Sequence, residues 1–327
     1  MGWKTLEISR ADKYNLVEGG IANKLFFISA PLMLTQVFQM AYNLTDMFWL
    51  GRLSSDAVAA SGAVGLFIWM SLSFMFFGRM GAEIGVSQNL GKGDKTKALC
   101  YAQNSIFISI TLGMALALIF FLGSEPFIGF LGIQEAHVAN DARDYLSIVS
   151  FSMPMAFLTA AISGIFNGAG NSRISLIING TGFMMNMILD PLLIFSAGLG
   201  IRGAGYATII AHSTAACIAL IVLLKYKNRP FEKINLFRRP EKAIIKQIIK
   251  WVLPVSIESF VFTFLAMLVT SIIATFGSGA IAASRVGSQI DSLAWLIAGG
   301  FASALTAFTG QNFGAGKWSR IRKGFRI

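Results

Sequence analysis

The stretch "ALCYAQNSIFISITLGMALALIFFL", residues 98–122, contains no Asp, Glu, Lys or Arg. A helix needs about 20 predominantly apolar residues to cross the hydrocarbon core of a bilayer. In hydrocarbon the backbone must satisfy its own hydrogen bonds, and a run this long and apolar does so as a helix. Residues 98–122 therefore predict a transmembrane helix.

The rest of the chain has the same character. Hydrophobic residues make up 55% of it and charged residues 13%, whereas a soluble domain carries about 25% charged residues. We predict an all-α polytopic membrane protein with about eight transmembrane helices. The predicted spans are 25–50, 57–86, 98–122, 145–167, 174–196, 203–224, 251–276 and 280–309.

Basic residues gather in alternate connections between these spans. The connection 225–250 holds nine Lys or Arg against two Glu, and the connection after the second span and the C-terminal tail are also basic. The positive-inside rule places such connections in the cytoplasm. The N-terminal segment 1–24 is then cytoplasmic too, and it lacks the apolar stretch of a signal peptide. The net charge of +11 indicates topology, with the lipid bilayer as partner and no nucleic acid.

A repeat divides the chain. "SQNLGKG" at 87–93 recurs as "GQNFGAG" at 310–316, and "AVAASG" at 57–62 recurs as "AIAASR" at 280–285, both at an offset of 223 residues. Six spans separate the copies, so the repeats are parallel, as in several transporter folds. We expect a complete six-helix first lobe at 25–224, a basic cytoplasmic linker at 225–250, and an incomplete second lobe at 251–327. The second lobe supplies two helices, so a truncated chain lacking about four helices is expected.

Several segments together resemble the multidrug and toxic compound extrusion (MATE) transporters. They are "APLMLTQVFQMAYNLTDMFWLGRLSSDAVAASG" (30–62), "FNGAGNSR" (166–173), "NMILDPLLIF" (186–195) and "GSQIDSLAWLIAGGFASALTAFTGQNFGAG" (287–316). The resemblance implies a cation-coupled exporter with two six-helix lobes around a central cleft.

Among the acids inside predicted spans, where ionisable groups are costly and usually face a cavity or a partner, Asp46 and Asp190 stand out. Asp46 is one turn beyond Asn43, and Asp190 is one turn beyond Asn186, so each acid shares a helix face with an amide. Thr208, near the start of the sixth span, is at similar depth. The simpler interpretation is that each acid only hydrogen-bonds a neighbouring helix.

By resemblance, Asp46, Asn186, Asp190 and Thr208 match a first-lobe site for protons or Na⁺, and Asn43 is added as the amide beside Asp46. The two acids are expected to titrate as a pair. Pro191 leaves the carbonyl of the residue four positions back without its helical donor and permits a bend. Ion uptake at the pair is then expected to bend the first or fifth span and close the first-lobe cavity.

Other polar residues are candidates for the substrate cavity: Gln36, Gln39, Glu258, Gln289 and Asp291. Asp291 could equally form a structural pair with Arg285. Arg79 and Glu83 are four residues apart and are expected to form a local ion pair.

The predicted function is an H⁺- or Na⁺-coupled antiporter that exports organic, cationic drugs across the cytoplasmic membrane. It is expected to act as a monomer without a cofactor, and not as an enzyme. The sequence "GKGD" at 91–94 matches a pattern of intramembrane aspartyl proteases, but it lies in a lysine-rich loop and is better read as a turn.

Alternatives are a flippase for lipid-linked saccharides, a passive channel, or an inactive partial chain. The excess of acids over bases within the spans favours cationic substrates over a pyrophosphate-linked saccharide.

Overall fold

The computed structural model describes residues 14–133, 135–226, 234–235, 238–274, 287 and 298–326. Helices dominate this part of the chain, which confirms the all-α prediction. Their bounds are α1 (Ile21–Leu53), α2 (Ser55–Gly91), α3 (Lys95–Leu122), α4 (Ser124–Phe130), α5 (Ala136–Ser150), α6 (Met153–Gly168), α7 (Ser172–Pro191), the π-helix η1 (Leu192–Ser196), α8 (Gly200–Lys225), α9 (Lys242–Ala274) and α11 (Trp318–Gly324). A further helix covers residues 298–314.

Six helical segments of the described residues are long and apolar enough to cross a membrane, and seven if α5 and α6 count as one bent span. They correspond to the first seven predicted spans. Of the eighth, predicted at 280–309, the structure describes a helix from residue 298, and most of the rest lies outside the described residues. Helix α9, which corresponds to the seventh predicted span, begins at Lys242, inside the predicted linker 225–250.

Proline explains two departures from straight helices. The fourth predicted span is divided into α5 and α6, which meet at an angle of 48°. Pro154 lies in the first turn of α6, where its missing N–H costs nothing but where it prevents α5 from continuing. Pro191 ends α7 and is followed at once by η1. A π-turn inside a membrane helix frequently marks a functional site.

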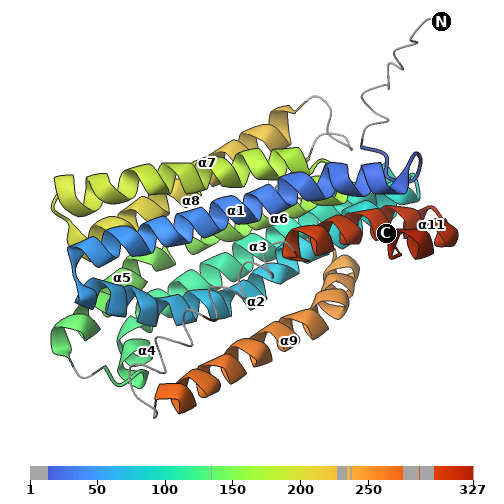
Figure 1. Ribbon diagram of the computed structural model, residues 1–327. Coiled ribbons are helices and arrows are strands. Elements are labelled where there is room, and N and C mark those ends of the chain that lie inside the picture. Colours follow the sequence, from blue (N-terminus) through green and yellow to red (C-terminus); the bar gives the residue numbers. More distant parts are fainter. Residues whose placement is uncertain are drawn as a thin grey trace, which may run out of the picture.

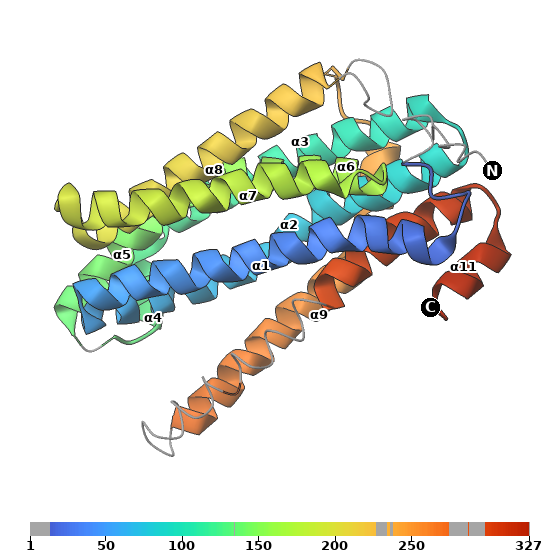
Figure 2. The same ribbon diagram turned by 45° about the horizontal axis from the view of Figure 1, so that its top comes forward.

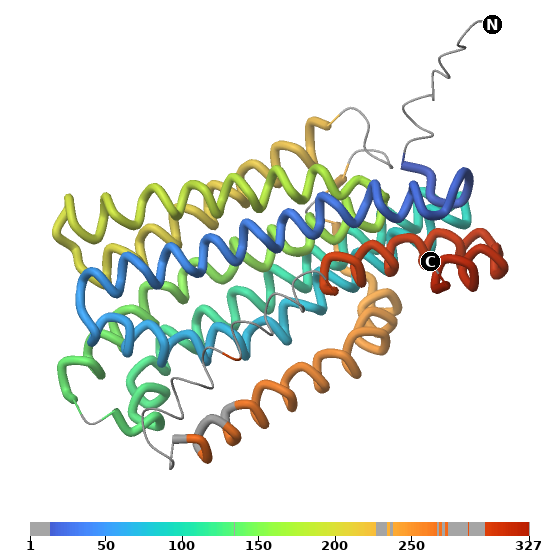
Figure 3. The backbone as a smooth tube through the Cα atoms, viewed as in Figure 1, coloured from blue at the N-terminus to red at the C-terminus, as the bar shows by residue number. Residues whose placement is uncertain are grey.

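The helices α1 to α8 form one elongated bundle (Figure 1), in which α1 lies beside α7, and α2 beside α3 and α6. Helix α9 packs against α2 and α3, and it diverges from the bundle toward its C-terminal end (Figure 2). The segment that begins at residue 14 and helix α11 lie at the same end of the bundle (Figure 3). Two large apolar clusters fill the interior, one toward each end.

Candidate functional site

Asp46 and Asp190 lie inside the bundle near the end formed by the C-terminal ends of α1 and α7. Asp190 is completely buried, and Asp46 is partly exposed. The two carboxyl groups are close enough to interact electrostatically. The two acids that the sequence singled out therefore belong to one cluster, supplied by neighbouring helices.

Asn186 and Thr208 join the two acids. The Asn186 amide faces the Asp190 carboxyl one turn along α7, with one amide position 2.7 Å from Asp190 Oδ2 and 3.3 Å from Oδ1. Thr208, on the neighbouring helix α8, donates from Oγ1 to the carbonyl of Ala204 at 3.0 Å. Both Asn186 and Thr208 are buried.

The amide of Asn186 has two useful orientations, because its nitrogen and oxygen are assigned from their partners. With nitrogen toward Asp190, it donates to the carboxylate, and its oxygen accepts from Thr208 N–H at 3.2 Å. With oxygen toward Asp190, its nitrogen donates to Thr208 Oγ1 at 3.4 Å, and the acid must carry a proton or share a cation. The first orientation satisfies both ends of the amide, whereas in the second the nitrogen also faces the Thr208 N–H.

Two tyrosines that the sequence analysis missed complete the cluster. The phenol groups of Tyr42 and Tyr145 interact with both acids and approach the Thr208 hydroxyl. Tyr42 precedes Asp46 by four residues, so the helix-face argument could have found it. Tyr145 is on α5, and no sequence spacing relates it to α1 or α7.

Aromatic contacts fix α1 against α7 on either side of Asp46. The ring of Tyr42 stacks on Phe183 with centroids 5.5 Å apart and planes 12° from parallel. Closer to the end of the bundle, Trp49 meets Phe195 of η1 edge-on at 6.0 Å. Such pairs stabilise by about 0.5–1.5 kcal/mol each beyond their buried area. They hold Asp46 beside α7 and η1.

The side chains of the cluster offer oxygen atoms as ligands for a cation. They belong to two carboxyls, an amide, a hydroxyl and two phenols. Asp46 Oδ1 is buried and has no hydrogen-bond partner in the described part of the chain. Buried polar atoms are normally satisfied, so this atom is available to a proton or a cation. Oxygen donors suit a hard cation such as Na⁺.

The remaining predicted residues are not drawn into this cluster. Asn43, Gln39 and Glu258 are exposed. Gln36 lies on another part of α1, where its side-chain amide is beside Gly299. Gln289 and Asp291, like Arg285, lie outside the described residues.

At the opposite end of the bundle, the two copies of the repeated sequence contact each other. A side chain at Gly91 would collide with the backbone of Gln311, and one at Gly314 would collide with the backbone of Gln88. A side chain at Gly310 would collide with the side chain of Ser87. Gln88 and Gln311, and Gly91 and Gly314, are equivalent at the offset of 223 residues, so the contact is reciprocal. We call residues 87–91 with 310–314 the clasp.

Two further sets of contacts extend the clasp: one lies between α2 and the helix 298–314, and the other is made by residues 14–20, which we call the strap. Glu83, expected to pair with Arg79, is buried and accepts a hydrogen bond from Ser303 Oγ at 2.7 Å. Residues 14–20 cross the clasp: Leu16 N–H donates to Gln311 Oε1 at 3.0 Å, and Arg320 donates to the carbonyl of Gly19 at 2.8 Å. The strap, residues 14–20, therefore binds the C-terminal helices to the start of α1.

Comparisons with known proteins agree on one family. The model of the MatE family matches residues 31–192 and 254–327. The probable multidrug resistance protein NorM of Thermotoga maritima is 28% identical over 306 residues, which cover 92% of this chain and 65% of that protein. The multidrug export protein MepA of Staphylococcus aureus is 24% identical over 307 residues, covering 93% and 67%. The chain thus spans about two thirds of the length of these relatives, 65% in the first case.

Solved structures show the same fold. A MOP superfamily transporter from Pyrococcus furiosus superposes with a TM-score of 0.90 at 21% identity, over 96% of this chain and 69% of that one. A multidrug resistance MATE family transporter in an outward-facing conformation gives a TM-score of 0.89 at 21% identity, over 96% and 69%.

The contacts of Asn186 predict a difference between the two amides that the sequence placed beside the acids. Replacing Asn186 with Leu leaves the buried Asp190 carboxyl without its amide partner, which we expect to destabilise the fold by about 1–3 kcal/mol. The matched change Asn43→Leu alters an exposed position and should stay within about 0.5 kcal/mol of the wild type. Denaturant unfolding in detergent measures both, and equal losses would show that Asn186 does not support Asp190.

Proposed function

The chain belongs to the MATE family, and from this premise we propose that it is, or forms part of, a cation-coupled exporter of organic cations. The convergence of Asp46 and Asp190 at one buried cluster of oxygen donors carries the proposal. Acids inside a membrane bundle are costly and are retained chiefly where they bind ions or relay protons. The names of the relatives, multidrug resistance and multidrug export proteins, support drugs as the substrate class.

The proposed orientation puts the clasp and the strap in the cytoplasm, and the acid cluster toward the outside, in a plasma membrane. The proposal is supported by the distribution of Lys and Arg, most of which lie in segments at the end of the bundle that carries the clasp. With the clasp closed, the cytoplasmic side is sealed and the acids are reached from outside. The exporter is proposed to act as a monomer.

The coupling ion is proposed to act through Asn186. A proton or Na⁺ that arrives at the acids neutralises Asp190, and the Asn186 amide turns its oxygen toward it and its nitrogen toward Thr208. This changes the contact between α7 and α8 directly beside η1. Because the π-helix η1 lacks the regular hydrogen-bond pattern of an α-helix, the junction of α7 with η1 is the part of this span that bends most easily. Bending there presses α1 and α7 together and expels the drug outward.

Alternating access then requires the clasp to open, so that drug enters from the cytoplasm. At Gly91 and Gly314 the clasp is formed against backbone, without interlocked side chains, so its opening chiefly requires breaking side-chain hydrogen bonds such as that between Ser303 and Glu83. Export would therefore alternate between neutralised acids with an outward release of drug, and ionised acids with an open clasp.

Removing either charge should stop coupled export. In the full-length protein reconstituted in vesicles, we expect Asp190→Asn and Asp46→Asn to reduce ethidium efflux to that of empty vesicles, because an amide cannot exchange a proton or neutralise Na⁺. Asp56→Asn, the same change at an exposed position near the same end, should keep wild-type efflux. Undiminished efflux with Asp190→Asn would remove Asp190 from the mechanism.

A disulfide across the clasp should arrest the cycle reversibly. The Cβ of a residue placed at 310 would lie 2.8 Å from that of Ser87, and a small separation of the helices gives the usual disulfide spacing of about 3.8 Å. In a Cys100→Ser/Cys217→Ser background, we expect Ser87→Cys/Gly310→Cys to lose efflux on oxidation and regain it on reduction. The single-cysteine variants, oxidised in the same way, are the controls. Full efflux by the cross-linked protein would show that the clasp stays closed during transport.

A further inference from the structure

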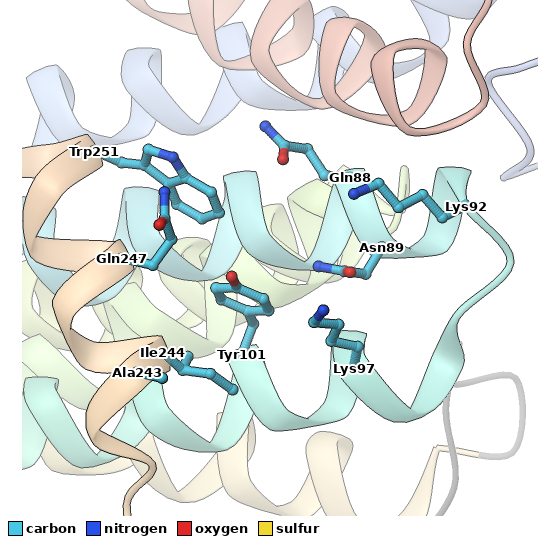
Figure 4. A pocket seen from close by; sticks show the side chains of 9 residues that line it. All are labelled: Gln88, Asn89, Lys92, Lys97, Tyr101, Ala243, Ile244, Gln247 and Trp251. Carbon is cyan, nitrogen blue, oxygen red and sulfur yellow. The ribbon is translucent and has the colours of Figure 1, made fainter.

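A cavity of about 270 Å³ opens beside the clasp, between α2, α3 and α9. Its wall on the α2 and α3 side carries Lys92 and Lys97, and its wall on the α9 side carries Gln247 and Trp251, with Tyr101 between them (Figure 4). The remaining lining residues are Gln88, Asn89, Ala243 and Ile244. The proposed transport cycle uses none of the two lysines, Tyr101 or Trp251.

The lining of this cavity is positively charged, because it includes two lysines and no acid. Within the described residues, no carboxylate forms an ion pair of 4.0 Å or less with Lys92 or Lys97. The nearest acid in the sequence, Asp94, is engaged in capping α3, where its Oδ1 accepts from Lys97 N–H at 2.8 Å. Three exposed lysines along α9 add to the potential: Lys242, Lys246 and Lys250.

The other lining groups are suited to an oxyanion at a membrane surface. The amides of Gln88, Asn89 and Gln247, the Tyr101 hydroxyl and the Trp251 indole can all donate hydrogen bonds. Tyr101 and Trp251 stack with centroids 5.4 Å apart and planes 20° from parallel. Paired aromatic rings with a polar edge are typical of the membrane–water interface, so the cavity lies at headgroup level rather than in the hydrocarbon core.

We propose that this cavity binds the phosphate of an anionic phospholipid from the cytoplasmic leaflet. Basic cavities between transmembrane helices on the cytoplasmic side recognise anionic headgroups through the same chemistry. At about 270 Å³ the cavity holds a headgroup, while the acyl chains lie along the outer surface of the helices. The bound lipid bridges α9 to α2 and α3, so it stabilises the arrangement in which the clasp is closed.

The test is lipid retention, which needs no transport. Protein released from nanodiscs of equal parts phosphatidylcholine and phosphatidylglycerol is analysed by native mass spectrometry. We expect the wild type to retain phosphatidylglycerol in preference to phosphatidylcholine. Each lysine near an anionic surface contributes about 1 kcal/mol, so Lys92→Gln/Lys97→Gln should bind phosphatidylglycerol roughly thirtyfold more weakly.

Two matched variants separate the cavity from overall charge. Lys95→Gln/Lys323→Gln removes two exposed lysines that do not line the cavity and should bind as the wild type does. Lys92→Arg/Lys97→Arg keeps both charges and should retain the lipid. Equal retention by the cavity variant and the Lys95/Lys323 variant would overturn the proposal.

A competition experiment distinguishes a lipid phosphate from free inorganic phosphate as the ligand. Inorganic phosphate added during release should not displace the lipid, and displacement would assign the cavity to free phosphate and overturn the lipid. The inference rests on the proposed orientation of the clasp toward the cytoplasm. Because the lipid experiment measures retention and not transport, a negative result would reject the lipid site alone. The proposed export function is tested separately, by the drug efflux of the Asp190 and Asp46 variants.

Discussion

Two interacting carboxyl groups in an apolar bundle, Asp190 buried and Asp46 partly exposed, constrain the structure around them. A buried acid without partners is strongly destabilising, so α1, α5, α7 and α8 each place a polar side chain at the same depth: Tyr42, Tyr145, Asn186 and Thr208. Even so, one oxygen of Asp46 remains without a protein partner. A cluster that is nearly but not fully satisfied by protein groups is the arrangement that an exchangeable ion requires.

At the other end of the bundle, the clasp joins the two copies of the repeat by close packing instead of by polar groups around acids. There the helices approach closely at glycines: Gly91 and Gly314 face backbone, Gly310 faces the Ser87 side chain, and the contacts are related by the internal repeat. A residue close to a pseudo-twofold axis meets its own repeat mate, which is why Ser87 abuts Gly310 and why Gly91 and Gly314 exchange partners. The same repeat that sets the topology therefore also supplies the clasp. In the proposed transport cycle, one end of the bundle binds an ion, and the other end opens and closes.

The fold was largely predictable because each span is an apolar run of sufficient length, and Asp46 and Asp190 stood out because charge in such a run is costly. Their partner Tyr145 was not predictable, since only tertiary packing brings α5 to α1. The start of α9 at Lys242 was hidden by its lysines; they lie on the exposed face, while Ile244 and Ile248 are buried against α2 and α3. The sequence displayed the repeat, but the contact between its two copies was not predicted, because it depends on which residues lie close to the axis.

The most direct measurement of the central claim is ethidium flux in vesicles carrying the full-length protein, with proton and sodium gradients imposed separately. If the acid cluster exchanges an ion for drug, one of the two gradients, directed so that the ion enters from the outer side, must accelerate export, and dissipating it must abolish the acceleration. Ethidium flux that is the same with either gradient, and with none, would contradict coupling at the acids and identify a passive pathway instead.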